Sequence, residues 1–206
     1  LQSQTPGTKH EIINASCIDT LVAHTNRFSA CVTSPPYNAG KEYETPLSIQ
    51  QYTEFANDWV TEVALALHPQ GQLWLNVGYM KVGKNSTLPL TYLYYPLILP
   101  YLHYIQEVVW HYEGGMAYKR RLTHRTERWM WWAQDPDNLV FNLDDIRDPE
   151  NTKYLNDPRC NPLGKNPSDY WRYDRVVGGN GASSEKTAHP CQFPERMIER
   201  IILAST

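Results

Sequence analysis

The feature that most constrains this chain is an apolar strand that ends abruptly at two consecutive prolines. Residues 28–33 have the composition of a buried strand, and Ser34, Pro35 and Pro36 follow at once. Proline has no amide proton to donate to a β-ladder, so the backbone must leave the sheet here. We therefore expect a rigid corner at the carboxyl end of a buried strand, where ligands bind in open α/β sheets.

The segments after this corner alternate between helix and strand patterns, which is typical of a parallel sheet. Ser48 and Gln51 form a capping box that opens an amphipathic helix. The expected elements are a short strand and a helix over 12–21, the strand 28–33, a helix from 48, a strand at 73–78, a loop at 81–89, a helix over 90–104 that Pro96 and Pro100 interrupt, strands at 105–110 and 129–133, and a strand or small hairpin at 139–141. The last expected element is an amphipathic helix with Pro194 in its first turn and Met197, Ile198, Ile201 and Ile202 on its apolar stripe.

Length and composition favour one globular domain. The chain has 206 residues, of which 41% are hydrophobic and 20% charged. No apolar run reaches membrane-spanning length, and no signal-peptide pattern is visible, so we expect no membrane partner. The four cysteines form no CxxC pair and no zinc-like cluster, so we expect reduced thiols, no metal site and an intracellular protein.

The net charge of −3 argues against a coat of basic residues, but it is compatible with a local basic patch. Such a patch is visible between residues 119 and 128, and it is either a solvated face or a surface that neutralises phosphates. Trp129, Trp131 and Trp132 are expected in the core rather than against a base.

The proline corner has the groups to hold an amino group attached to a planar ring. The ring could lie on Tyr37, while the Ser34 hydroxyl and the Pro35 carbonyl accept the two amine hydrogens. These hydrogen bonds would favour a pyramidal nitrogen whose lone pair can attack an electrophilic methyl group. The alternative is a plain Pro-Pro turn after a strand.

Four motifs in order carry a resemblance that covers nearly the whole chain. It resembles the S-adenosylmethionine-dependent DNA amino-methyltransferases of the N4-cytosine/N6-adenine family. Within that family it is similar to the permuted (β) class, in which the catalytic motif precedes the cofactor-binding motif. The motifs are Thr33-Ser-Pro-Pro-Tyr-Asn38, the segment 67–75, Phe141-Asn-Leu-Asp-Asp-Ile-Arg147, and Glu185 to Pro194 with the helix that follows to residue 206.

The resemblance implies a fold and a reaction. The fold would be a Rossmann-like three-layer α/β/α methyltransferase sheet, permuted, of which this chain holds the catalytic half and an irregular insertion at 151–181 for target recognition. The reaction would transfer a methyl group from S-adenosylmethionine to the N4 amine of a cytosine flipped out of double-stranded DNA. Ser34, where adenine enzymes typically have Asp or Asn, favours cytosine. The alternatives are an N6-adenine enzyme, in DNA or RNA, and a catalytically silent DNA-binding or partner subunit.

The resemblance also assigns residues. It places the target base at Ser34, Pro35, Pro36 and Tyr37, with Tyr37 stacked on the base. Segment 185–206 would lie at the methionine end of the cofactor, with no metal required. The expected cofactor contacts are Thr33, Asn38, His189, Pro190, Gln192 and Pro194, and the expected DNA contacts are Lys119, Arg120, Arg121, Arg125, Arg128 and Arg172.

Two departures from the family pattern stand out. The stretch 14–17 (Asn-Ala-Ser-Cys) occupies the place of an acidic Gly-Asp-Cys motif, and residue 206 comes before any DPFxGxG-like glycine loop. We therefore expect one methyltransferase domain, 1–206, that is incomplete at its C-terminus; inactivity of this chain alone is the alternative to an active enzyme. A complementing C-terminal segment or a homodimer would complete it. The expected setting is restriction-modification or another DNA-methylation role, in the bacterial cytoplasm and nucleoid or in a nucleus.

Overall fold

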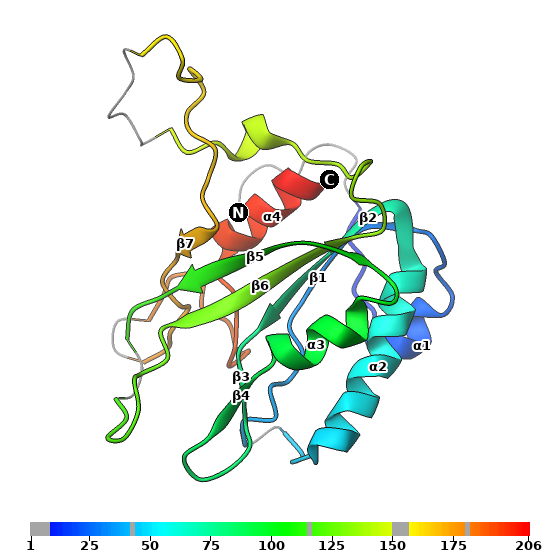
Figure 1. Ribbon diagram of the computed structural model, residues 1–206, viewed down its shortest axis with the longest axis vertical. Coiled ribbons are helices and arrows are strands. Elements are labelled where there is room, and N and C mark those ends of the chain that lie inside the picture. Colours follow the sequence, from blue (N-terminus) through cyan, green and yellow to red (C-terminus); the bar gives the residue numbers. More distant parts are fainter. Residues whose placement is uncertain (1–8, 42–43, 115–116, 150–156, 180–181) are drawn as a thin grey trace.

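The structure, a computed structural model, describes residues 9–41, 44–114, 117–149, 157–179 and 182–206, and it is built on a mixed five-stranded sheet (Figure 1). The strand order is β1-β2-β6-β5-β7. β1 and β2 are parallel, as are β5 and β7, while β6 is antiparallel to both of its neighbours. The strands are β1 (Phe28–Thr33), β2 (Leu67–Val77), β5 (His103–His111), β6 (Thr126–Ala133) and β7 (Tyr170–Arg172).

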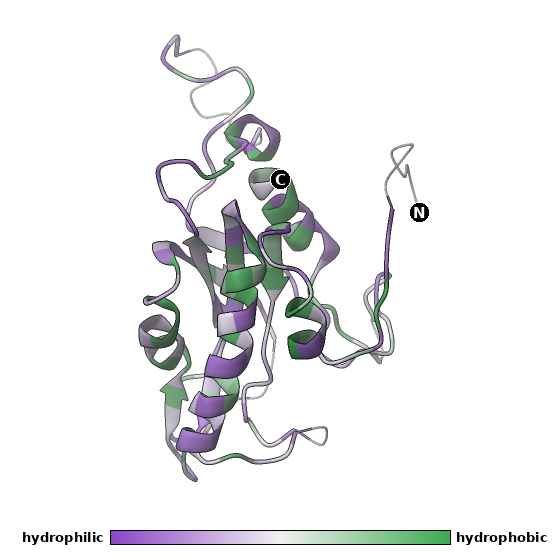
Figure 2. Ribbon diagram, turned by 90° about the vertical axis from the view of Figure 1, so that its right-hand side faces the viewer, coloured by the Kyte–Doolittle hydropathy of each residue, from purple (hydrophilic) through white to green (hydrophobic). Residues whose placement is uncertain are grey.

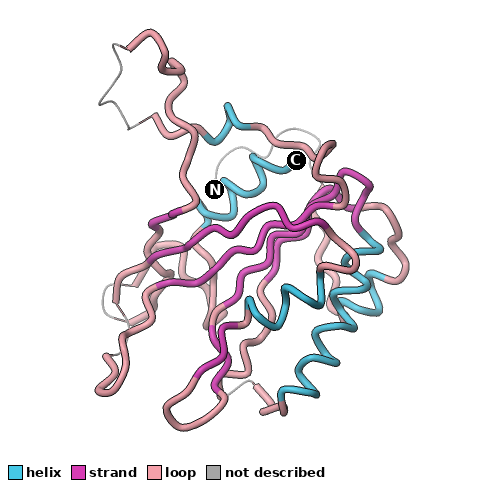
Figure 3. The backbone as a smooth tube through the Cα atoms, in the orientation of Figure 1, coloured by secondary structure: helices cyan, strands magenta, loops and turns pink. Residues whose placement is uncertain are grey.

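Helices cover both faces of this sheet, and the backbone trace in Figure 3 shows them around the strands. Two short strands form a separate hairpin beyond the end of β2, and a 3-10 turn follows β6. The remaining elements are α1 (Cys17–Leu21), α2 (Ile49–Ala66), α3 (Thr91–Ile98), α4 (Glu195–Ser205), the hairpin strands β3 (Tyr79–Lys81) and β4 (Thr87–Pro89), and the turn η1 (Leu143–Ile146).

Alternating residues of β2 and β6 belong to two separate hydrophobic cores, one on each face of the sheet. Leu73 and Trp132 pack in a cluster with α2 and α3, whereas Trp74, Trp129 and Trp131 pack on the opposite face with α4. Successive side chains of a strand point to opposite faces, so one apolar strand can supply both cores. The three-layer α/β/α architecture predicted from the sequence is therefore confirmed, and the three tryptophans are core residues as expected.

Helix α2 begins as the sequence predicts. The Ser48 hydroxyl accepts a hydrogen bond from the Gln51 amide at 3.2 Å, and the Gln51 side chain accepts one from the Ser48 amide at 2.9 Å. Tyr52, Trp59 and Val63 are buried on its inner face, and the outward face in Figure 2 is mostly hydrophilic. This helix covers β1 and β2 and supports the corner that follows β1.

The connection from α2 to β2 is tighter than predicted. The helix ends at Ala66 and the strand begins at Leu67, so residues 68–71 belong to the strand and not to a turn. The register with β1 shifts between Phe28 and Ala30, which accommodates these residues. A Cβ at Gly71 would lie 2.7 Å from the His68 carbonyl oxygen and 2.8 Å from that of Phe28, so only glycine fits without backbone movement.

Five other expectations about elements are wrong in detail. Ile12 is 97% exposed and no strand forms around it. The predicted loop at 81–89 includes β4 and the last residue of β3, residues 139–141 form no strand, and α3 includes Pro96 but stops before Pro100. Pro194 is the N-cap of α4 rather than part of its first turn, and Ile202 is exposed. Local sequence patterns do not reveal these differences, because strand pairing and tertiary packing determine them.

None of the helices in the described ranges is both long and apolar enough to cross a membrane.

Candidate active site

The proline corner opens onto a large cavity beyond the carboxyl ends of β1 and β2. Its volume is about 1100 Å³, and all four residues from Ser34 to Tyr37 line it. Thr33, the last residue of β1, lines it as well. The structure therefore places the predicted base-binding residues together, on the wall of one cavity. Walls from distant parts of the chain complete it, including Tyr79, Tyr112, His124, Glu127, Arg175 to Gly178, Lys186, and His189 to Phe193.

Tyr37 is held by its ring and by its hydroxyl. A Cβ at Gly78 would lie 2.7 Å from the Tyr37 ring, so the ring packs directly on the backbone after β2. The Tyr37 hydroxyl lies 2.7 Å from Oδ1 of Asn76 and 2.9 Å from Oε2 of Glu127, and its one proton is shared between these two acceptors. The Ser34 hydroxyl donates to the Tyr37 oxygen at 3.2 Å. The sequence predicted the ring but not these partners.

Glu127 is a buried carboxyl group at the wall of the cavity. Burial raises its pKa above the usual range for glutamate, while hydrogen bonds from Tyr37 and Tyr112 and the charge of Arg175 act in the opposite direction. Burial, followed by the nearby Glu127 carboxylate, raises the pKa of Tyr37 well above its usual range, so Tyr37 keeps its proton. A neutral phenol therefore lies beside a carboxyl group with an elevated pKa.

Glu127 was not predicted as a site residue, although its position in the strand pattern of β6 is informative. Glu127 shares an alternation with Trp129 and Trp131, which face the buried α4 side of β6. A charged residue on the buried alternation of a strand is rare unless it is paired, and such residues gather at functional sites. Asn76 has the same property, because it is 0% exposed on β2.

Asn38 does not line the cavity as the cofactor assignment expected. Its side chain donates to the Leu47 carbonyl at 2.7 Å and accepts from the Leu47 amide at 2.9 Å. Its φ of 52° lies in the left-handed region, which asparagine tolerates better than most residues. In this structure Asn38 therefore fixes the loop that leads from the corner to α2.

The segment before α4 forms the opposite wall. His189, Pro190 and Gln192 line the cavity, whereas Pro194 is buried at the start of the helix. The Gln192 side chain is used within the segment, because it donates to the Glu185 carbonyl at 2.7 Å and accepts from the Thr187 amide at 2.9 Å.

Two charged side chains stabilise this wall further. The Glu185 carboxylate accepts from the Glu195 amide at 2.8 Å and so caps α4. Lys186 donates to the His189 carbonyl. The wall is therefore held in place by its own hydrogen bonds, and α4 anchors it to the sheet.

The predicted DNA-contacting residues differ in their solvent exposure and in their contacts with other side chains. Lys119 and Arg120 are exposed, and Arg121 lies over the Tyr118 ring at 4.0 Å. Arg128 pairs with Glu107 at 3.1 Å, and Arg172 lies 3.8 Å from Glu113. Arg125 is partly buried, and its Nη1 has no hydrogen-bond partner among the described residues.

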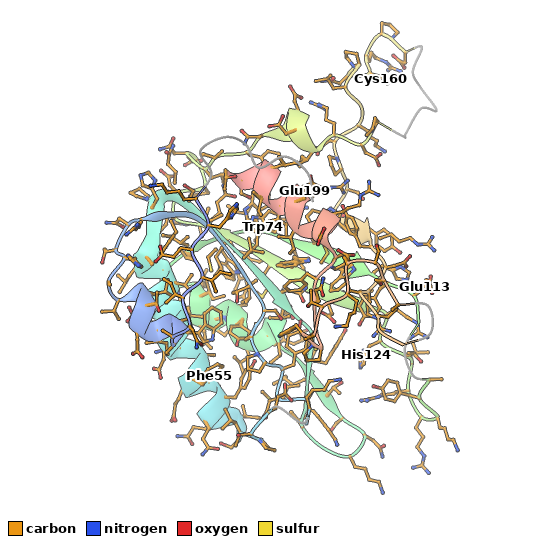
Figure 4. The ribbon with its side chains drawn as sticks, turned by 180° about the vertical axis from the view of Figure 1, so that it is seen from behind. Phe55, Trp74, Glu113, His124, Cys160 and Glu199 are labelled. Carbon is orange, nitrogen blue, oxygen red and sulfur yellow. The ribbon has the colours of Figure 1, made fainter. Side chains whose placement is uncertain are left out.

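Segment 117–125 joins β5 to β6 next to the cavity, which Tyr118 and His124 line. The candidate recognition insertion divides into two parts. Residues 175–178 line the cavity, but residues 157–165 extend from the opposite end of the molecule in Figure 1. Figure 4 shows the same separation, with His124 and Cys160 far apart. Residues 151–156 and 180–181 of this insertion lie outside the described residues.

Two polar atoms at the cavity have no protein partner. Nε2 of His124 and Nε of Arg175 are buried without a hydrogen bond within the described part of the chain. Buried polar groups are normally paired, so both atoms are available to hydrogen-bond a ligand or water in the cavity. No group of three or more metal-ligating side chains occurs among the described residues.

Known proteins similar to this chain are DNA methyltransferases. The family model N6_N4_Mtase, described as DNA methylase, matches residues 28–206. Type II methyltransferase M.ScaI from Streptomyces caespitosus is 46% identical over 86% of this chain and 60% of its own length. DNA adenine methyltransferase YhdJ from Escherichia coli K12 is 30% identical over 84% of this chain and 58% of its own length. The chain spans a little under two thirds of these relatives.

The fold comparison agrees. The structure of the PvuII cytosine-N4-specific DNA methyltransferase matches with a TM-score of 0.67 at 14% identity, over 93% of this chain and 68% of that one. The M1.HpyAVI complex with SAM matches with a TM-score of 0.53 at 18% identity, over 93% and 74%. At these identities the likeness concerns the fold alone. The match to the family model covers most of the sequence, so this chain belongs to the DNA methylase family of N6 and N4 methyltransferases.

Proposed function

We propose that the cavity at the end of β1 is a methyl-transfer site for an exocyclic amine of a flipped DNA base, with the N4 amine of cytosine as its target. One observation carries the proposal. Ser34, Pro35 and Tyr37 form one wall of a cavity large enough for a base and a second ligand. Serine at position 34, where adenine enzymes of the family typically have Asp or Asn, supports cytosine.

The corner residues would act by accepting hydrogen bonds. Pro35 and Pro36 have no amide proton, so the corner forms no regular ladder around the Pro35 carbonyl. The Ser34 hydroxyl proton is already directed to Tyr37. Both oxygens thus offer lone pairs to the two amine hydrogens. As the amine attacks, positive charge grows on nitrogen where these oxygens already point, which lowers the barrier without reorganisation.

The cavity also has room for S-adenosylmethionine, which supplies an electrophilic methyl group when bound. Thr33, beside the corner, and His189 and Pro190, on the opposite wall, line this space and would contact it. Nε of Arg175 and Nε2 of His124, which have no hydrogen-bond partner among the described residues, offer polar contacts to it. Gln192 would act indirectly, by fixing the segment that carries His189. No metal is needed for this chemistry.

Double-stranded DNA would approach the end of the molecule where segment 117–125 lies. Lys119 and Arg120 are the most exposed of the basic residues there, and they would neutralise phosphates. Arg128 and Arg172 are already near carboxylates, so we assign them a weaker part.

We propose that a further segment, in the same protein or in a second copy, completes the cofactor site. The relatives are longer than this chain, and M.ScaI is covered over 60% of its length. The chain lacks a DPFxGxG-like glycine loop after a strand. The whole protein would act inside the cell, on its DNA. Its role would be that of a modification enzyme like the Type II methyltransferase M.ScaI.

The reaction is tested by incubating the full protein with DNA and isotopically labelled S-adenosylmethionine, then digesting the DNA to nucleosides. The proposal predicts labelled N4-methylcytosine. Labelled N6-methyladenine alone would show that the target is adenine, the second candidate that the 30% identical adenine enzyme YhdJ supports. No label in either base, with intact DNA binding, would favour a silent subunit.

A further inference from the structure

Three polar side chains form a continuous hydrogen-bond chain that leads from the corner to a buried carboxyl group. Ser34 donates to Tyr37 at 3.2 Å, and Tyr37 donates to Oε2 of Glu127 at 2.9 Å. The chain joins residues 34, 37 and 127, which come from the ends of two different strands. Its direction is fixed, because an ionised carboxylate can only accept hydrogen bonds.

This direction decides which way the Ser34 hydroxyl points. If Glu127 accepts, Tyr37 must donate to it, and the Tyr37 oxygen then accepts from Ser34. The Ser34 proton is thereby turned away from the cavity, and its lone pairs are left for an incoming amine. Tyr37 has two acceptors, Oε2 of Glu127 and Oδ1 of Asn76. If neither accepted its proton, the Ser34 hydroxyl could equally present its own proton to the amine and oppose the reaction.

We propose that Glu127 is a positioning residue of the methyl-transfer site, which orients Ser34 through Tyr37 and takes up the proton that the target amine loses. The inference rests on the proposed function. As the amine nitrogen bonds to the methyl carbon, the bond from that carbon to the sulfonium sulfur breaks, and its electron pair stays on sulfur as a neutral thioether. The amine nitrogen is then positively charged and its N–H acidic. That proton passes to Ser34 Oγ, the Ser34 proton passes to Tyr37 Oη, and the Tyr37 proton passes to Glu127 Oε2. The methylated amine ends neutral, and Glu127 ends as a carboxylic acid.

The groups around Glu127 suit both the ionised carboxylate before the proton transfer and the carboxylic acid after it. The groups that face it are Tyr37 after β1, Tyr112 after β5 and Arg175 after β7. Arg175 and the two hydroxyl donors favour the ionised form at rest, while burial makes the carboxylate a stronger base than an exposed glutamate. Once Glu127 is protonated, Tyr37 can still donate to Asn76, whose Oδ1 lies 2.7 Å away.

The first arm of the test needs no activity. In the full protein labelled with ¹³C at glutamate carboxyl groups, the Glu127 signal is identified by its loss in Glu127→Gln. We expect it to titrate above ordinary glutamates. Tyr37→Phe should raise its midpoint further, because the substitution removes a donor that stabilises the carboxylate. The control Tyr104→Phe, on β5 and away from the cavity lining, should not. An unchanged midpoint in Tyr37→Phe would overturn the hydrogen-bond chain.

The second arm measures single-turnover methyl transfer against pH, with DNA binding measured in parallel. In the wild type the rate should fall as pH drops through the Glu127 midpoint, because the protonated carboxyl cannot accept a proton. Glu127→Gln should slow transfer by about 10²-fold, a typical share for acid–base groups, and should lose this pH dependence. The control Glu62→Gln, on α2 outside the cavity lining, should behave as wild type.

Adding Tyr37→Phe to Glu127→Gln should cost little more than either change alone, since the residues act as one chain. A Glu127→Gln enzyme with the wild-type rate and pH profile would overturn the role of Glu127. If the wild type methylates no DNA, the proposed function fails and the proton-accepting role fails with it. The titration arm still reports in that case whether the chain exists.

Discussion

The Tyr37 ring depends on a single missing side chain. Gly78 has no Cβ, and a Cβ there would lie 2.7 Å from the ring, closer than real contacts allow. The ring is a rigid group whose hydroxyl is already fixed, so it cannot easily move aside. Position 78 therefore controls where the aromatic wall of the cavity stands.

We expect Gly78→Ala to reduce methyl transfer by the full protein on the order of 10²-fold, because a displacement near 1 Å is costly at a reacting centre. The free energy of unfolding should fall by about 1–3 kcal/mol from overpacking. Single-turnover rates and denaturant unfolding measure the two effects. The control Gly83→Ala places its Cβ near the flexible Ser86 hydroxyl only, and wild-type behaviour of both variants would refute the packing argument.

Residue types alone predicted one half of the site and missed the other. The run from Ser34 to Tyr37 could be found because its members are adjacent and two prolines stop a strand. Glu127 and Asn76 could not be joined to Tyr37, because their contact depends on β2 and β6 lying side by side, which no local pattern shows.

At the scale of elements, α4 explains why two distant motifs occur together. The Asn142 side chain donates to the carbonyls of Leu203 at 3.1 Å and Thr206 at 2.8 Å. Its amide donates to Ala204 at 3.0 Å. Asn142 thus satisfies the last carbonyls of α4, which otherwise lack partners. The motif at 141–147 holds the end of the helix whose start carries the cavity wall.

Removal of this contact should loosen α4. We expect Asn142→Ala to lower the free energy of unfolding by about 1–2 kcal/mol, since two side-chain hydrogen bonds are lost. Denaturant unfolding of the full protein measures it. The control Asn57→Ala, exposed on α2, should change stability little, and an equal effect of both substitutions would argue against a specific cap.

The apolar face of α4 gives a second prediction. Met197 is 0% exposed against the tryptophan core, whereas Ile202 is 46% exposed. We expect Met197→Ala to cost about 2–5 kcal/mol of unfolding free energy because it leaves a cavity. Ile202→Ala should cost far less, although spacing alone placed both on the stripe. Equal losses in unfolding experiments would contradict the observed face of the helix.

Periodicity predicted α2 and the four long strands well, because each buries a regular apolar pattern. It failed where pairing decides the outcome. The hairpin at 79–89 and the antiparallel direction of β6 depend on neighbours in space. The split of the insertion between the cavity and the far end could not be read from its composition either.

At the scale of the whole molecule, the basic residues indicate which end meets DNA. Lys119 and Arg120 lie beside the cavity, whereas Arg159 lies in the extension at the other end and pairs with Asp157 at 2.6 Å. We expect Lys119→Ala and Arg120→Ala each to reduce the salt slope of DNA binding by about 1. Arg159→Ala should leave it unchanged. The opposite pattern in salt-dependent binding titrations would place the DNA at the wrong end for this site.

The most direct test of the account is single-turnover methyl transfer by the full protein with Ser34→Ala. The matched control is Ser29→Ala, an exposed serine on β1, the strand that Ser34 follows, which does not line the cavity. Loss of a preorganised polar contact at a reacting centre costs on the order of 10²-fold, so Ser34→Ala should slow transfer to that extent with unchanged DNA affinity. Ser29→Ala should match the wild type. Transfer at the wild-type rate by both variants would show that this corner does not hold the target amine.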